Sequence, residues 1–249
     1  MPKTMPGSPT TVDILTQRRR SWRTKPVLRR LYRTWYETIR SALTSGRILE
    51  IGGGSGNLKE FIDHAWVSDI VPVPWIDVAV DAHHIPAKDG CLGNLVLFDV
   101  LHHLSSPAVF FREADRVLRP GGRLLMMEPN VSLASFPIYR FFHHEGLQWT
   151  DDPFNLPKSG GKRPMDGNQA IPTLIFDKHR SKFFHQFPMF RSVMDKKMDF
   201  VIYPLSGGFH HPSLWPDAGW PILERLERLL CPFARLLAFR RLVVLEKRA

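Results

Sequence analysis

Apolar positions in the middle of the chain follow two alternating periods. Runs of strand length cover 48–51, 66–68, 76–80, 95–98 and 123–127, and further runs follow at 200–205 and 241–247. Between them, apolar residues recur at helical spacing, most clearly over 108–118. Strands and helices in regular succession predict a parallel sheet that is covered by helices on both faces.

Helical spacing also predicts long helices near both ends of the chain. Residues 12–43 contain no glycine and one proline, Pro26, which marks a helix start or a break. Residues 222–239 predict an amphipathic helix, and residues 57–64 predict the start of another. The periodicity is lost between residues 130 and 197, where Phe, His, Pro and Gly are frequent. An insertion this long is typical of a lid.

These patterns predict an α/β fold with a seven-stranded, mostly parallel sheet, a helical N-terminal extension and an insertion after the fifth strand. We divide the chain into a basic tail and helix over 1–45 and a main domain over 46–249. The insertion, 130–197, is expected to be a lid or to bind an acceptor molecule. Its aromatic residues suit an apolar pocket wall or a small core of the lid itself.

The net charge of +10 is concentrated at the two ends. Residues 1–45 contain ten Lys or Arg and two acids. Residues 221–249 contain seven Lys or Arg and three acids. The middle is nearly neutral, which argues against a nucleic-acid groove across the core. The basic helices are either solvated faces packed on the domain or contacts with a membrane surface or another polyanion.

Cysteine content and hydropathy indicate a cytoplasmic protein that is at most peripheral to a membrane. The two cysteines, Cys91 and Cys231, have no paired spacing, so we expect reduced thiols and no metal site. No window holds eighteen apolar residues, and the first eleven residues lack the apolar run of a signal peptide.

The first predicted strand contains an acid, Glu50, and is followed by a glycine-rich turn, Gly52–Gly53–Gly54–Ser55–Gly56. Glycines between a strand and a helix let a ligand approach the backbone closely. The spacing is not the dinucleotide pattern G-x-G-x-x-G, because its third glycine position is Asn57. A carboxylate here suits a cationic ligand better than a pyrophosphate.

Further acids follow the other strands at Asp69, Asp81, Asp99 and Glu128. In open α/β sheets, ligands bind at the carboxyl ends of the strands. The sequence therefore predicts a binding site that several acids share at one edge of the sheet.

The stretch 50–56 resembles the first motif of the class I S-adenosylmethionine-dependent methyltransferases, whose sheet is Rossmann-like. Asp69, Asp81–Ala82, 99–104, 113–122 and Glu128–Pro129 are similar to later motifs of that family, in the same order. The turn after Asp99 is most similar to the type 11-like members, which act on small molecules. The resemblance implies S-adenosylmethionine (SAM) as cofactor, held by Glu50, Gly52, Gly53, Gly54, Gly56, Asp69, Ile70, Asp81, Ala82, Asp99 and Val100. Asp69 and Asp81 also fit turn or cap residues, and Asp99 also fits contact through its backbone alone.

Candidate bases for methyl transfer are histidines that follow the strand ends. His103 is the first choice, and His102, His143, His144 and Glu145 are the others; each also fits packing or surface roles. The resemblance implies O- or C-methylation of a small-molecule or lipid-linked acceptor. Two alternatives stay open: a SAM-binding protein without catalysis, and an RNA methyltransferase recruited by the basic arm.

Overall fold

The computed structural model describes residues 10–143, 145–156, 165–209 and 211–249. Its strands are β1 (Ile48–Ile51), β2 (Trp66–Asp69), β3 (Val78–Ala79), β4 (Leu92–Phe98), β5 (Leu118–Pro129), β6 (Phe190–Met198) and β7 (Arg240–Lys247). They form one sheet in the order β3-β2-β1-β4-β5-β7-β6. β7 pairs antiparallel with β5 and with β6, and the other pairs are parallel. The prediction of a seven-stranded, mostly parallel sheet is confirmed.

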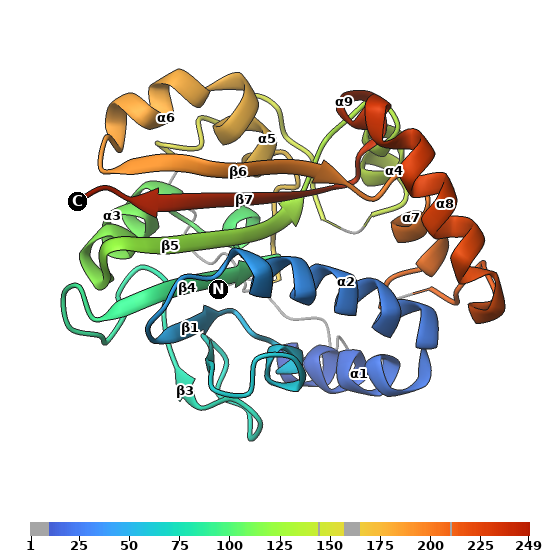
Figure 1. Ribbon diagram of the computed structural model, residues 1–249, viewed down its shortest axis with the longest axis horizontal. Helices are drawn as coiled ribbons and strands as arrows, with labels where there is room; N and C mark the ends of the chain where they lie inside the picture. The colour runs from blue at the N-terminus through green and yellow to red at the C-terminus, as the bar shows by residue number, and fades with distance from the viewer. Residues whose placement is uncertain (1–9, 144, 157–164, 210) are drawn as a thin grey trace.

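Helices cover both faces of this sheet (Figure 1). They are α1 (Thr11–Thr24), α2 (Pro26–Ala42), α3 (Pro107–Val117), α4 (Ser135–Phe141), α5 (Ile171–Thr173), α6 (Arg180–Gln186), α7 (Ile202–Ser206), α8 (Trp220–Leu230) and α9 (Ala234–Leu237). A π turn, Leu174–Lys178, joins α5 to α6, and short 3-10 turns lie at Asn57–Glu60, Leu101–His103, Asp217–Gly219 and Cys231–Phe233. Both cysteines are unpaired.

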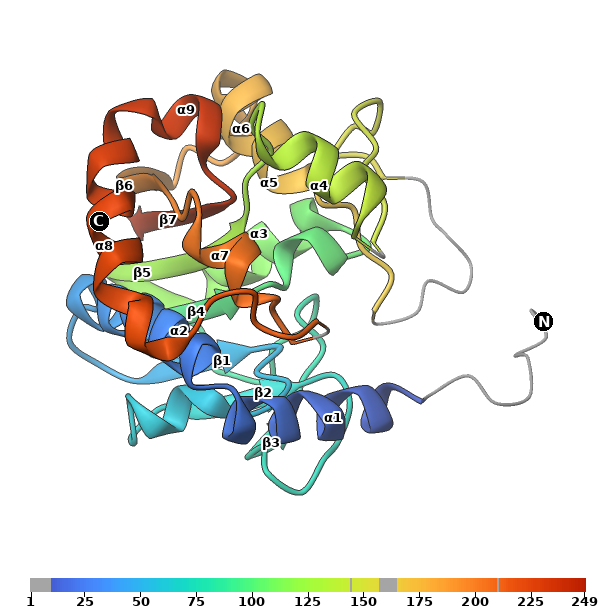
Figure 2. The same ribbon diagram turned by 90° about the vertical axis from the view of Figure 1, so that its right-hand side faces the viewer.

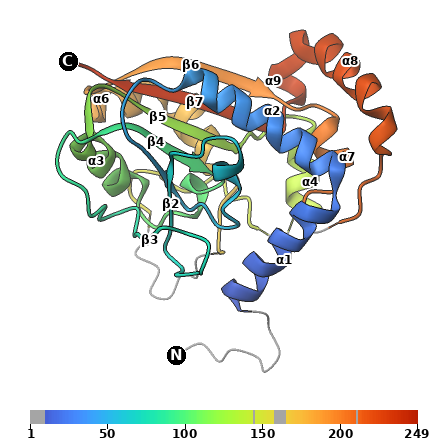
Figure 3. The same cartoon turned by 60° about the horizontal axis from the view of Figure 1, so that its bottom comes forward.

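Alternate residues of each central strand enter two hydrophobic cores, as the period of a strand requires. In β4, Leu95 and Leu97 pack with α3, α5 and α6, while Val96 and Phe98 pack with α2 and α8. α2 crosses the sheet and places Trp35 and Ile39, both fully buried, against it (Figure 3).

The predicted helix over 12–43 is two helices, and the break is at Pro26. Thr10 caps α1 in a capping box with Asp13, whereas Pro26 occupies the first turn of α2. None of the helices in the described ranges is both long enough and apolar enough to cross a bilayer.

The strand predicted over 200–205 is wrong, because these residues form α7. The carboxylate of Glu227 on α8 accepts the backbone N–H groups of Phe200, Val201 and Ile202 at 2.8–2.9 Å. Glu227 thereby caps the start of α7, although it is 25 to 27 residues away in the sequence. No local sequence pattern reveals a cap of this kind. The sixth strand is instead β6, whose residues 190–197 lie inside the predicted insertion.

The helix expected from residue 57 is only the 3-10 turn Asn57–Glu60. Phe61 N and Ile62 N both donate to Leu58 O, and the chain then turns into β2. The C-terminal helix predicted over 222–239 is interrupted at Cys231–Phe233, between α8 and α9.

Candidate active site

A cleft that is open to solvent lies where β1, β2 and β4 end. The structure brings ten of the eleven predicted cofactor residues into its lining: Glu50, Gly52, Gly53, Gly54, Asp69, Ile70, Asp81, Ala82, Asp99 and Val100. The eleventh, Gly56, lies outside this lining. It has a φ of 73° and starts the 3-10 turn, so its role is in the conformation of the turn.

The glycine turn after β1 needs glycine for two separate reasons. Gly52 and Gly54 have φ values of 69° and 49°, which disfavour any residue with a Cβ. A Cβ on Gly52 would also collide with Val100 Cγ2, and one on Gly53 would collide with Val67. The turn therefore presents bare backbone to the cleft and packs tightly behind it.

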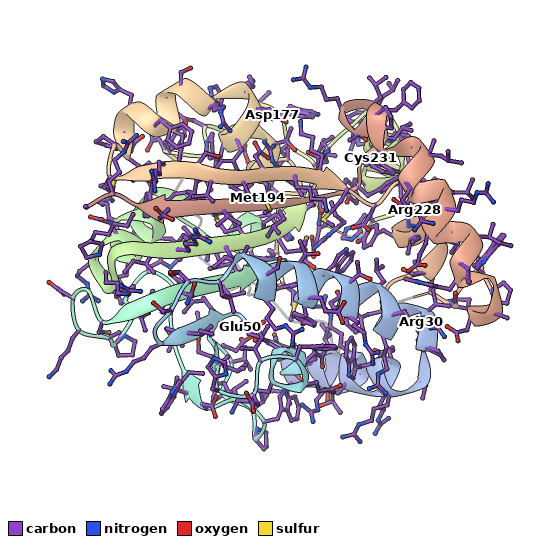
Figure 4. All side chains as sticks on the ribbon, in the orientation of Figure 1. Arg30, Glu50, Asp177, Met194, Arg228 and Cys231 are labelled. Atoms are coloured by element: carbon purple, nitrogen blue, oxygen red, sulfur yellow. The ribbon has the colours of Figure 1, made fainter. Side chains whose placement is uncertain are left out.

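Glu50 places a buried carboxylate beneath this turn, on β1 in the interior of the molecule (Figure 4). Its Oε2 atom has no hydrogen-bond partner within the described part of the chain. Burial, and then the charge of Asp69, raise the pKa of Glu50 to about 8. A buried acid without a partner is costly unless a ligand donates to it, so this atom marks a place for a cationic group.

Asp69 and Asp81 lie in the cleft with their carboxylates held by the backbone. Asp69 accepts Gly54 N through Oδ2 and Val71 N through Oδ1, each at 2.9 Å, but burial still raises its pKa. Asp81 Oδ1 accepts from His83 N at 2.9 Å and pairs with His83 Nδ1 at 2.7 Å. Burial opposes the charge on Asp81, yet these bonds lower its pKa.

His83, which the sequence interpretation missed, orients Asp81. Ser106 N donates to its Nε2 at 3.2 Å, so the ring proton is on Nδ1 and faces the carboxylate.

Helix α1 forms a wall of the cleft that the sequence interpretation did not assign. Thr11, Leu15 and Arg18 line the cleft from this helix. Arg19 fixes α1 to the glycine turn, because its Nη1 donates to Ser55 O at 2.8 Å and its guanidinium lies 4.6 Å from the Trp75 ring. The sequence showed these arginines only as a basic helix face, since nothing local indicates which of them turns inward.

Arg18 is the one Lys or Arg among the described residues that line the cleft. Its Nε is buried without a hydrogen-bond partner in that part of the chain. The cleft thus offers one cationic side chain to a ligand, beside several acids.

His102, one of the predicted bases, does not line the cleft. It is buried under the cleft, with Nδ1 2.7 Å from Glu128 Oε2 and Nε2 3.1 Å from Glu145 Oε2. Burial disfavours its charge, but Glu128 and then Glu145 outweigh it and raise the pKa of His102 well above the ordinary value. Both ring nitrogens therefore face carboxylates, and these contacts hold the turn after β4.

His103, the first choice, lines the cleft. Burial and the neighbouring charge of His102 lower its pKa to about 3, so its imidazole is neutral. Its Nε2 atom lies 3.5 Å from Glu145 Oε1. His143 lies 3.9 Å from Glu145 and is not among the described lining residues, and His144 lies outside the described residues.

Arg240 of β7 holds the side chain of Asp99 in place through an ion pair. Arg240 Nη1 lies 2.6 Å from Asp99 Oδ1, and the guanidinium sits over the rings of Trp35, Phe98 and Tyr203. Glu128 completes the turn by accepting Val100 N and Leu101 N at 2.9 and 2.8 Å. Asp99 has a φ of 56°, and this network holds it in that conformation.

The sheet order, the glycine turn and the acids at the strand ends define the class I SAM-dependent methyltransferase fold. A family model described as "Methyltransferase domain" matches residues 18–166, and the chain belongs to this family. Two solved structures have a similar fold. One is a SAM-dependent methyltransferase from Thermotoga maritima, described as a possible histamine N-methyltransferase, with 13% identity, 96% and 99% coverage of the two chains and a TM-score of 0.54. The other is a SAM-dependent methyltransferase from Archaeoglobus fulgidus, with 15% identity, 88% and 94% coverage and a TM-score of 0.53.

Among curated proteins, the chain is 44% identical over 87 residues to an uncharacterized 37.1 kDa protein in transposon TN4556 of Streptomyces fradiae. The match spans 34% of this chain and 24% of that relative.

The residues of the cleft fit SAM, the cofactor of this family. The unpartnered Oε2 of Glu50 suits the ammonium group, and Arg18 suits the carboxylate. The bare backbone of 52–54 leaves room for close approach. Asp69 and Asp81 supply acceptors for the hydroxyl and amino groups of the adenosyl part. When bound, the cofactor supplies an electrophilic methyl group.

Proposed function

We propose that this protein transfers a methyl group from SAM to an oxygen or carbon atom of a small-molecule or lipid-linked acceptor. The observation that carries the proposal is that the cleft extends beyond the residues that fit the cofactor. Its lining also includes His103, Met165 and the rings of Tyr32, Tyr36 and Phe209. These side chains offer an apolar, aromatic surface and one neutral imidazole to a second ligand.

Binding and orientation are the main contributions of the chain. Glu50 and Arg18 fix the charged end of the cofactor, and the turn over 99–103 is held rigid by Glu128 and Arg240. A preorganised wall of this kind keeps reacting groups in position, an effect worth up to about 7–11 kcal/mol.

His103 is the group that takes a proton from a hydroxyl or carbon acceptor. Its imidazole is neutral at neutral pH, since its pKa is lowered to about 3, so one ring nitrogen has a lone pair that can accept a proton. Glu145 Oε1 lies 3.5 Å from Nε2, so this carboxylate stabilises the imidazolium that forms when the ring takes a proton.

The test is transfer of labelled methyl groups from SAM into three fractions: a small-molecule extract, a lipid extract and total RNA. We expect label in one of the first two fractions. The Gly54→Val variant, whose new side chain enters the cleft, should abolish it. Label in RNA alone would favour recruitment by the basic arm. Measurable SAM binding with no labelled product in any fraction would favour a protein that binds SAM without catalysis.

A further inference from the structure

Helix α4 and the segment from α8 to α9 expose large apolar side chains on one side of the molecule. Ala134 N donates to Leu236 O at 3.0 Å, which joins the start of α4 to α9. We call the following residues the apolar face: Leu133 (77% exposed), Phe136 (39%), Phe141 (74%), Phe142 (75%), Leu229 (63%), Phe233 (56%) and Leu236 (52%). Figure 1 shows α4, α8 and α9 together at one end of the sheet.

The exposure of these side chains does not come from loose packing of α4. Tyr139 and Ser135 on its inner side are buried, and the Tyr139 hydroxyl donates to Phe239 O at 2.6 Å. The helix is therefore anchored through its inner side to Phe239, which directly precedes β7, and its outer aromatic residues are not part of that contact. Clustered exposure of this size marks an interaction surface.

The charges around the apolar face are mostly positive. Arg140, Arg225, Arg228 and Arg235 are exposed, and none of them forms an ion pair with another described residue. Arg228 lies on α8 at the outer side of the molecule (Figure 4). The two acids of α8 form hydrogen bonds within the fold. Glu227 caps α7, and Glu224 accepts from Trp220 Nε1 at 2.7 Å.

We propose that the apolar face docks on an anionic lipid bilayer. Aromatic and leucine side chains enter the interface between headgroups and acyl chains, while nearby arginines pair with anionic headgroups. A second copy of this chain fits less well, since it would bring two sets of arginines together. In Figure 2, α1 runs along the bottom of the view, below α4 and α8, and it contributes no residue to the apolar face as defined above. This surface does not depend on methyl transfer.

Flotation with vesicles of phosphatidylcholine, with and without phosphatidylglycerol, tests the proposal at low and at physiological salt. We expect the protein to float only with the anionic vesicles. The double variant Phe141→Ser/Phe142→Ser should lose binding. The double variant Arg228→Gln/Arg235→Gln should bind about 30-fold more weakly at low salt, as expected for two charges near the surface.

Control variants remove an aromatic residue or two arginines elsewhere on the surface. Trp66→Thr removes an exposed aromatic residue from β2, and Arg33→Gln/Arg40→Gln removes two exposed charges from α2. Both should float as the unchanged protein does, and every variant should bind SAM normally in calorimetry, which shows that it is folded. Absence of flotation overturns the proposal. Equal loss in the controls also overturns it, because attraction would then follow total charge. Self-association through the face without flotation would assign it to a second copy instead.

Discussion

The buried carboxyl of Glu50 should have two measurable effects. It should lower the free energy of unfolding as pH rises, and it should strengthen the binding of SAM. Its pKa is about 8 in the folded chain and 4.5 in the ordinary state. Between these values the unfolded chain has lost the proton that the folded chain keeps, so stability is greatest below the lower value and falls as pH rises toward 8. The difference between the two pKa values is about 3.5 units, and each unit corresponds to about 1.4 kcal/mol. The loss of unfolding free energy that Glu50 causes is therefore at most about 5 kcal/mol.

The Glu50→Gln variant removes this dependence and keeps the shape of the side chain. In urea unfolding without ligand, the variant should gain stability over the unchanged protein as pH rises from 5 to 8, by up to the limit above. SAM binding at pH 7 should release about one proton from the unchanged protein, since the ammonium group favours the ionised carboxylate. The variant should release none and bind about 10- to 150-fold more weakly, as expected for a lost charge-assisted bond.

Calorimetry in two buffers with different ionisation enthalpies measures the released proton. A stability difference between the two proteins that is the same at pH 5 and pH 8 would refute the raised pKa. Identical binding heats in both buffers for the unchanged protein would refute the coupling of Glu50 to the ligand.

Three further predictions concern other residues of the cleft. Arg18→Gln should weaken SAM binding about 10- to 150-fold but leave decarboxylated SAM unaffected. Arg20→Gln on the exposed side of α1 should change neither, and equal losses for both ligands would remove Arg18 from the carboxylate site. His103→Gln should lower kcat about 10²- to 10⁴-fold with unchanged SAM affinity. The rate of the unchanged protein should not fall from pH 8 to pH 6 through protonation of His103, whose pKa is about 3; a variant with full activity would exclude it as base. Gly54→Val should abolish SAM binding in calorimetry while circular dichroism stays unchanged, because it forces a side chain into the cleft at a φ of 49°.

The central sheet could be predicted because its strands are buried, and buried strands appear in the sequence as runs of apolar residues. β4 is buried along its whole length, whereas β6 is an edge strand with mostly exposed, charged residues such as Arg191 and Lys196. An exposed edge has no hydrophobic pattern to detect. The error at 200–205 has the opposite cause: an apolar run became a helix because Glu227 caps it from a distant part of the chain.

The acids that line the cleft could be predicted to lie together because they follow strands directly. Glu50, Asp69 and Asp81 meet at one edge of the sheet for topological reasons. Arg18, His83 and Arg240 could not be placed, since each reaches the site through packing of elements far away in the sequence. His102 and His103 are neighbours in sequence, and only the position of the two glutamates distinguishes their roles.

The position of α1 has a practical consequence for the choice of where a shortened protein should begin. The stretch that the family model recognises starts at residue 18, inside this helix, yet Thr11 and Leu15 stand on the rim of the cleft. A shortened protein that began there would retain every strand of the sheet. It would nevertheless lose the cap of α1 and an entire turn of the wall next to the glycines, so a failure to retain ligand would reflect the cut and not the chemistry of the enzyme.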